Sequence, residues 1–168
     1  MERSKKMFDF LKKKTKEYYD VVGAPLKGQA VASAEVSDPT FAKEMLGKGM
    51  AIKPSEGKVY APYDGKVALV FDTKHAVSIV SEKGTEVLIH VGIDTVMLKG
   101  ENFTMHVKTG SAVKKGDLLL EFDIGAINAA GYDTITPVVI CNVSDYKDVI
   151  CITDKQVEIG DTVMELDK

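Results

Sequence analysis

The sequence places one histidine, His90, inside the apolar run at residues 87–91, with the carboxylate of Asp94 four residues later. A lone histidine in such a run is commonly a core residue whose ring needs only one hydrogen-bond partner. A second histidine, His75, begins a neighbouring alternating run, and the short glycine-containing segment at residues 82–84 predicts a β-hairpin. Two close imidazoles suit metal ligation, acid–base catalysis or the carrying of a phosphoryl group on nitrogen.

The register of this hairpin decides whether the two rings meet. If residues 82–83 form the loop, His75 lies directly opposite His90, with their Cβ atoms about 5 Å apart on one face. If residues 83–84 form it, the rings are diagonal neighbours on one face, whereas a three-residue loop puts them on opposite faces. Two of the three registers therefore predict a histidine pair. The apolar neighbours expected beside it are Val77 and Leu88.

Metal ligation by this pair requires a third and usually a fourth ligand. Asp94 can supply one, but the other histidine is the isolated His106, which we expect to be exposed, and Cys141 and Cys151 lie in separate apolar runs. The sequence lacks the spacings Cys-x-x-Cys, His-x-His and His-Glu-x-x-His, and also a nucleophile elbow, a P-loop and a dinucleotide fingerprint. We therefore predict no metal and no cofactor, although His90-x-x-x-Asp94 matches half of a zinc peptidase pattern and leaves a metal-dependent hydrolase as an alternative.

Several blocks of this sequence stand in an order that is specific to one known family. They are Thr73-Lys74-His75-Ala76, Ile89-His90-Val91-Gly92-Ile93-Asp94-Thr95-Val96, Leu98-Lys99-Gly100, Val36-Ser37-Asp38-Pro39-Thr40-Phe41, Gly49-Met50-Ala51-Ile52-Lys53-Pro54, Ala61-Pro62-Tyr63-Asp64-Gly65 and Thr136-Pro137-Val138-Val139-Ile140. With these blocks the chain resembles the glucose-type enzyme IIA of the bacterial sugar phosphotransferase system, over roughly residues 20–168.

The resemblance implies that His90 accepts a phosphoryl group from the histidine phosphocarrier protein and passes it to a cysteine on the IIB domain of a sugar permease. It also implies that His75 stabilises the phosphoryl oxygens and that Thr73 orients His75. A histidine with a pKa near 6.5 is mostly neutral in the cytoplasm, and the neutral ring is nucleophilic. A second function stays open, that of a regulatory binding module that signals sugar status through its phosphorylation state.

An apolar surface around the pair is expected to exclude water and to dock the partner protein. Its candidate members are Phe41, Met45, Leu46, Phe71, Leu88 and Val96. The resemblance further implies that Asp38 and Asp94 contact an arginine of the donor protein, which these carboxylates attract before transfer.

Composition limits the remaining choices. A chain of 168 residues is long enough for one domain with a sizeable core, and a net charge of −3 gives no reason to expect nucleic-acid binding. The two cysteines, the lack of a secretory leader and the lack of a long apolar run indicate a cytoplasmic protein.

The body of the sequence consists of short runs rich in Val, Ile and Thr, separated by Gly, Asp and Lys. This predicts an all-β fold, an antiparallel β-barrel or sandwich with short helical turns, one of them within residues 124–132. Residues 113–123 are echoed by residues 157–167, and residues 24–28 by residues 61–65. These echoes indicate a duplicated strand motif.

Residues 1–20 differ in character, with seven basic side chains before Glu17. We expect a basic, flexible leader at residues 1–20 and an enzyme IIA-like β domain at residues 21–168. Apolar side chains at helical spacing in the leader also suit a short amphipathic helix. Such a helix would make weak contact with anionic lipid at the inner face of the membrane. Of the two, we favour a solvated, mostly disordered leader.

Overall fold

Short antiparallel strands make up most of the regular secondary structure in this computed structural model, which describes residues 16–168. The strands are β1 (Asp20–Gly23), β2 (Gly28–Ala32), β3 (Gly49–Pro54), β4 (Lys58–Tyr60), β5 (Gly65–Val70), β6 (Ala76–Ser81), β7 (Glu86–His90), β8 (Phe103–Met105), β9 (Ala112–Val113), β10 (Leu118–Phe122), β11 (Thr136–Ile140), β12 (Asp148–Cys151), β13 (Lys155–Val157) and β14 (Thr162–Asp167). The helical elements are α2 (Pro39–Ala42), α3 (Ile124–Ala129) and the 3-10 turns η1 (Ser33–Glu35), η2 (Thr95–Leu98) and η3 (Val143–Asp145).

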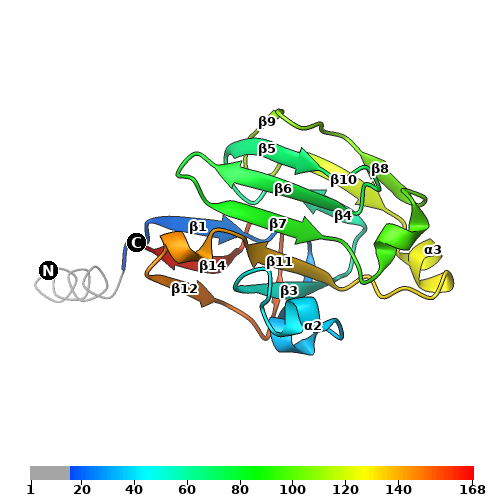
Figure 1. Cartoon of the computed structure of the whole chain (residues 1–168), viewed down its shortest axis with the longest axis horizontal. Coiled ribbons are helices and arrows are strands. Elements are labelled where there is room, and N and C mark those ends of the chain that lie inside the picture. Colours follow the sequence, from blue (N-terminus) through cyan, green and yellow to red (C-terminus); the bar gives the residue numbers. More distant parts are fainter. Residues whose placement is uncertain (1–15) are drawn as a thin grey trace, which may run out of the picture.

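The strands form three sheets that enclose one main apolar core. The largest sheet has the order β13-β2-β3-β11-β7-β6-β5-β9, and the two smaller sheets have the orders β1-β14-β12 and β4-β10-β8. Figure 1 shows β5, β6, β7, β11 and β3 as successive strands, with α2 near β3 and α3 at one end of the molecule. Side chains from all three sheets are fully buried together, among them Val22, Ile89 and Leu120. The all-β prediction is confirmed, in its sandwich form.

The duplicated motif is visible as two equivalent corners. At one, the Ala61 amide donates to the Asp117 carbonyl at 2.8 Å and the Gly116 amide donates to the Ala61 carbonyl at 2.9 Å. At the other, Ala24, Asp161 and Gly160 repeat the same two bonds at 2.7 and 3.0 Å. Each glycine has a positive φ, which this turn requires and which a side chain disfavours. The expected helical turn after β10 is also present, as α3.

Alternation along β7 separates a core face from an outer face. Val87 and Ile89 are fully buried in the core, whereas Leu88 and His90 lie on the opposite face and are partly exposed. Because β7 is paired on both sides, with β6 and β11, its backbone groups are satisfied and His90 is held on a rigid strand.

The start of the folded domain lies before Val21. Asp20 is the first residue of β1 and is buried, and the Tyr19 amide donates to the Leu166 carbonyl at 2.9 Å. A boundary between Asp20 and Val21 therefore cuts through β1. The rest of the predicted leader, residues 1–15, lies outside the described residues. Within residues 16–168, no helix is long and apolar enough to cross a membrane.

Candidate functional site

The two histidine rings meet, although the hairpin register differs from both favourable ones. The pairing places Ala76, not His75, opposite His90, and the Ser81 amide donates to the Thr85 carbonyl across a three-residue loop. The prediction of direct or diagonal pairing is therefore wrong. Nevertheless the ring centroids of His75 and His90 are 4.8 Å apart, with their planes at 85°.

The reason lies in a turn that precedes β6. Lys74 has a φ of 61°, and its amide donates to the Phe71 carbonyl at 2.8 Å. His75 follows this turn and precedes the first residue of β6, so strand alternation does not fix the direction of its side chain. Thr73 also lies in the turn and not on a strand. Val77, expected beside the pair, is instead fully buried in the core.

His90 is fixed in one orientation by its own loop. Its Nδ1 atom lies 2.8 Å from the carbonyl oxygen of Gly92, which can only accept, so Nδ1 carries the proton. In the neutral ring this leaves a lone pair on Nε2. Phe41 of α2 packs against the ring, with centroids 4.9 Å apart.

His75 is more deeply buried, with 3% of its surface exposed. Its Nδ1 atom lies 2.7 Å from Oγ1 of Thr73, and Phe71 packs edge-on against the ring at 5.5 Å. When the Thr73 hydroxyl donates to Nδ1, the proton of the neutral His75 ring resides on Nε2.

Both reactive nitrogens are open. Neither Nε2 atom, of His75 or of His90, makes a hydrogen bond to a residue of the described chain. Among residues 16–168, no buried side-chain nitrogen or oxygen lacks a partner, so both Nε2 atoms must reach the surface. The rings therefore present one lone pair and one N–H to an incoming group.

The surroundings keep both rings neutral. Burial, and to a smaller extent the neighbouring His90, lower the pKa of His75 to about 4, while the backbone of Thr73 opposes the shift. Burial also lowers the pKa of His90, against the opposing effects of the Gly92 carbonyl and of the carboxylates Asp38 and Asp94. Desolvation of the charged ring is the leading cause in both cases.

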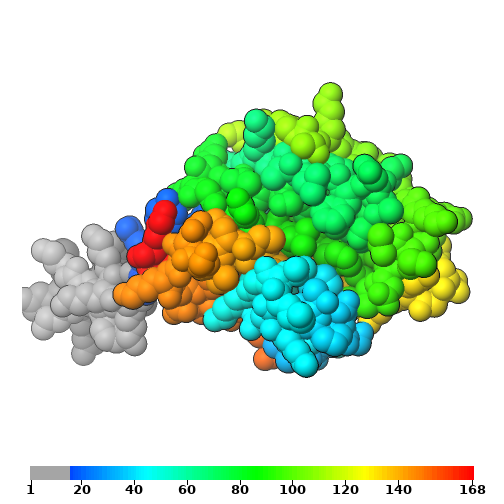
Figure 2. All heavy atoms as spheres, in the orientation of Figure 1, coloured from blue at the N-terminus to red at the C-terminus, as the bar shows by residue number. Residues whose placement is uncertain are grey.

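The predicted apolar surface divides into two kinds of residue. Phe41 is buried against the ring of His90 and the partly exposed Phe71 packs against His75, while the partly exposed Leu88 packs against the cluster that contains Phe41. Met45 and Val96, in contrast, are 70% and 46% exposed. The other exposed apolar side chains of these two segments are Leu46 and Met97. Figure 2 shows the segment around α2, in cyan, protruding beside the green surface of the central strands.

The two predicted carboxylates begin the flanking helical turns. Asp38 precedes α2, and its Oδ1 atom accepts a hydrogen bond from the Thr40 amide at 2.9 Å. Asp94 precedes η2 with a φ of 60°, and its side chain is exposed. Both act on the pKa of His90. The structure thus brings both acids near the ring of His90.

Two features of the loop after β7 were not identified from the sequence. The Gly92 carbonyl sets the protonation of His90, and the loop that holds it is closed by the Thr95 hydroxyl, which donates to the Val91 carbonyl. A glycine two residues after a histidine, at a strand end, is the signal that was available. It marks a backbone conformation with positive φ, here 79°.

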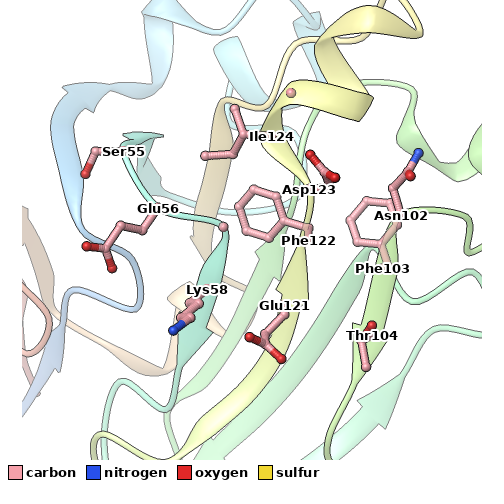
Figure 3. A pocket seen from close by; sticks show the side chains of 12 residues that line it. Ser55, Glu56, Lys58, Asn102, Phe103, Thr104, Glu121, Phe122, Asp123 and Ile124 are labelled. Carbon is pink, nitrogen blue, oxygen red and sulfur yellow. The ribbon is translucent and has the colours of Figure 1, made fainter.

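The remaining candidates lie elsewhere. His106 is exposed, as expected, and its Nε2 atom lies 2.7 Å from Oε2 of Glu121. Glu121 also lines a hollow of about 760 Å³ across β4, β10 and β8, where Phe122, Phe103 and Lys58 lie (Figure 3). None of the lining residues of this hollow belongs to the histidine site. Among residues 16–168, no group of three or more His, Cys, Asp or Glu side chains is arranged to hold a metal ion.

Comparison with known proteins gives one family. The family described as phosphoenolpyruvate-dependent sugar phosphotransferase system, EIIA 1, matches residues 20–146. The PTS system glucose-specific EIIA component of Oceanobacillus iheyensis is 44% identical over 157 residues, which cover 94% of each chain. The structure of glucose permease IIA from Mycoplasma capricolum superposes with a TM-score of 0.81, at 34% identity, over 86% of this chain and 94% of that one.

Other relatives are much longer. The PTS system beta-glucoside-specific EIIBCA component of Dickeya chrysanthemi is 50% identical over 143 residues, which are 85% of this chain but 23% of that protein. The corresponding component of Bacillus subtilis is 48% identical over 127 residues, or 21% of its length. The chain thus spans about a quarter or less of the length of these relatives.

Proposed function

The chain belongs to the EIIA 1 family of the phosphoenolpyruvate-dependent sugar phosphotransferase system, whose components transfer phosphate through a histidine, and we propose that His90 is that histidine. The observation that carries the proposal is the hydrogen bond between Nδ1 of His90 and the Gly92 carbonyl. It leaves the lone pair of Nε2 free at the surface, in a ring that burial keeps neutral.

In the proposed reaction, Nε2 of His90 attacks the phosphorus of a phosphohistidine on the histidine phosphocarrier protein. The new N–P bond forms as the donor's N–P bond breaks, and Nδ1 of His90 keeps its proton throughout. In the second step a cysteine thiolate on the IIB domain of a sugar permease attacks the same phosphorus, and Nε2 of His90 leaves. No water and no cofactor take part in either step.

His75 supports this transfer without carrying the group. Phosphoryl transfer spreads negative charge over the equatorial oxygens, so catalysis depends on positioning and on nearby donors. With Thr73 donating to Nδ1 of His75, the N–H at Nε2 is available to these oxygens beside His90. Thr73 is therefore a positioning residue for His75.

The apolar rim and the two acids belong to the docking surface. Met45 and Val96 are exposed on the segments that carry Asp38 and Asp94, and such apolar side chains can exclude water and protect the phosphorylated ring from hydrolysis. Asp38 and Asp94 attract a basic group of the donor before transfer, and repel the transferred phosphate afterwards. This function places the chain in the cytoplasm, on the side where the permease presents its IIB domain.

Incubation with a phosphoenolpyruvate-charged phosphocarrier, followed by mapping of the modified residue, tests the assignment. We expect label on His90, none in His90→Gln, and wild-type labelling in His106→Gln, a matched control at an exposed histidine outside the site. Stoichiometric phosphate on His90→Gln would disprove the proposal.

A further inference from the structure

The Gly92 carbonyl, which sets the protonation of His90, lies in a loop that is held from two directions. On the outside, the Gly92 amide donates to the Ile135 carbonyl and the Ile93 amide to the Asp133 carbonyl, both at 3.1 Å. These bonds use backbone atoms and fix the position of the loop against the segment that leads into β11. Because the Ile93 amide belongs to the same peptide plane as the Gly92 carbonyl, its bond to Asp133 also sets the direction in which that carbonyl points, as long as the loop stays in place.

On the inside, one side chain closes the loop. Thr95 is fully buried, and its Oγ1 atom donates to the Val91 carbonyl at 2.5 Å, joining the last residue of the loop to the first. Its Cγ2 atom lies 2.5 Å from the position that a Cβ on Gly92 would take. Thr95 therefore both ties the loop ends and fills the space beneath Gly92.

This closure also holds a conformation that the chain alone disfavours. Gly92 and Asp94 have φ values of 79° and 60°, so two of the three residues between Val91 and Thr95 are left-handed. A left-handed residue with a side chain, such as Asp94, is strained, so such a loop persists only where its surroundings impose it.

We propose that Thr95 is a positioning residue for His90: by tying the ends of the loop together, its hydroxyl keeps the Gly92–Ile93 peptide seated against Asp133 with the Gly92 carbonyl directed at Nδ1, and so keeps the lone pair on Nε2. The proposal rests on the role of His90 proposed above, but its immediate consequence concerns the unphosphorylated protein. Without the bond between Thr95 and Val91, the carbonyl turns away part of the time and the proton of His90 distributes between its two nitrogens.

The test combines ring NMR with transfer kinetics on the full chain. Nitrogen-15 spectra of the histidine rings report directly which nitrogen of His90 carries the proton. Thr95→Val removes the hydroxyl and keeps the volume, whereas Thr95→Ser keeps the hydroxyl. The matched control is Thr85→Val, at an equally buried threonine near the other end of β7.

We expect the proton of His90 on Nδ1 in the wild type, in Thr95→Ser and in Thr85→Val, and on both nitrogens in Thr95→Val. Phosphoryl acceptance should slow about three- to tenfold in Thr95→Val, the equivalent of one hydrogen bond. If Thr95→Val does not fold, Thr95→Cys supplies a donor of similar size but weaker strength and should shift the proton in the same direction.

An unchanged His90 ring in folded Thr95→Val would overturn the proposal, as would an equal change in Thr85→Val, which would reveal general loosening of the hairpin. The two proposals fail separately. If His90 of the wild type never becomes labelled, the transfer function is wrong, while the ring spectra still decide the role of Thr95.

Discussion

The two ends of the β6–β7 hairpin treat their polar groups in opposite ways. At the loop end, the buried carboxylate of Asp20 accepts hydrogen bonds from the hydroxyls of Ser81 at 2.7 Å and of Thr85 at 2.6 Å, and Tyr146 completes the cluster. At the other end, His75 and His90 each use Nδ1 in a local hydrogen bond and leave Nε2 without a described partner.

The difference separates stability from function on one pair of strands. A buried carboxylate is tolerable only when its oxygens are hydrogen-bonded, and the loop end satisfies this requirement by joining β1 to the hairpin. At the histidine end, the two Nε2 atoms have no partner among the described residues. They therefore add no hydrogen bond to the free protein but are available to a phosphoryl group. Changes at the two ends should therefore affect different measurements.

The largest effect should follow from His75→Gln, measured on the onward transfer of phosphate. A glutamine amide can also donate one hydrogen bond, but it is not held in the same position as the ring. Where a donor to a developing charge is lost, the cost is typically about 2.7–4 kcal/mol, or roughly a hundred- to thousand-fold in rate. We expect His75→Gln to accept phosphate from the carrier and to donate it slowly. Rapid-quench experiments in both directions measure this, and donation at the wild-type rate would contradict it.

A smaller effect, on stability alone, should follow from Asp20→Ala at the loop end. The hydroxyls of Ser81 and Thr85 lose their buried acceptor, which should lower the free energy of unfolding by about 2–3 kcal/mol. Urea denaturation measures this loss of stability. A chain that begins at Val21, and so lacks Asp20, should show the same loss. Asp94→Asn, at an exposed acid of the histidine end, is the control and should unfold like the wild type.

If Asp20→Ala also slows phosphoryl acceptance while it remains folded, the two ends are coupled. That result would show that stability at the loop end and transfer at the histidine end are not independent.

The pH dependence of stability should depend on the histidine end. Because the folded-state pKa of His75 is lowered to about 4, the folded state resists protonation. The stabilising contribution of the neutral ring is complete above pH 6.5 and is lost as the pH falls toward 4. Between pH 6.5 and about pH 5, this amounts to about 1–2 kcal/mol.

Unfolding curves of the wild type and of His75→Gln across this interval measure the contribution, since the carboxylates titrate alike in both. We expect a steeper loss of stability in the wild type. Parallel curves would show that the burial of His75 does not govern its protonation.

The smallest effect should come from trimming an exposed apolar side chain at the histidine end. Val96→Ala should raise the KM for the phosphocarrier about two- to fivefold, because a residue at the rim of an interface contributes little individually. Val21→Ala makes the same substitution at a similarly exposed valine of β1 and should leave KM unchanged. Equal KM values for the two variants would place the docking surface elsewhere.

The sequence by itself determined the class of fold and the family. Alternating runs predict strands because side chains of a strand with one buried face must alternate, and β7 follows this rule residue by residue. The Ala-Pro and Gly-Asp echoes appear as the two equivalent corners, because their hydrogen bonds are local and depend on turn residues. The motifs around His75 and His90 were sufficient to indicate the family.

Only the tertiary structure decided how the two rings meet. Register reasoning assumed that His75 lay on a strand. Instead the left-handed Lys74, two residues before β6, interrupts the strand, and the ring of His75 meets that of His90. Likewise, no local pattern predicts that Asp20 lies within reach of Thr85, 65 residues away, and so belongs to the core rather than to a leader. Alternation and turn chemistry act over a few residues, but packing between distant segments depends on the whole folded chain.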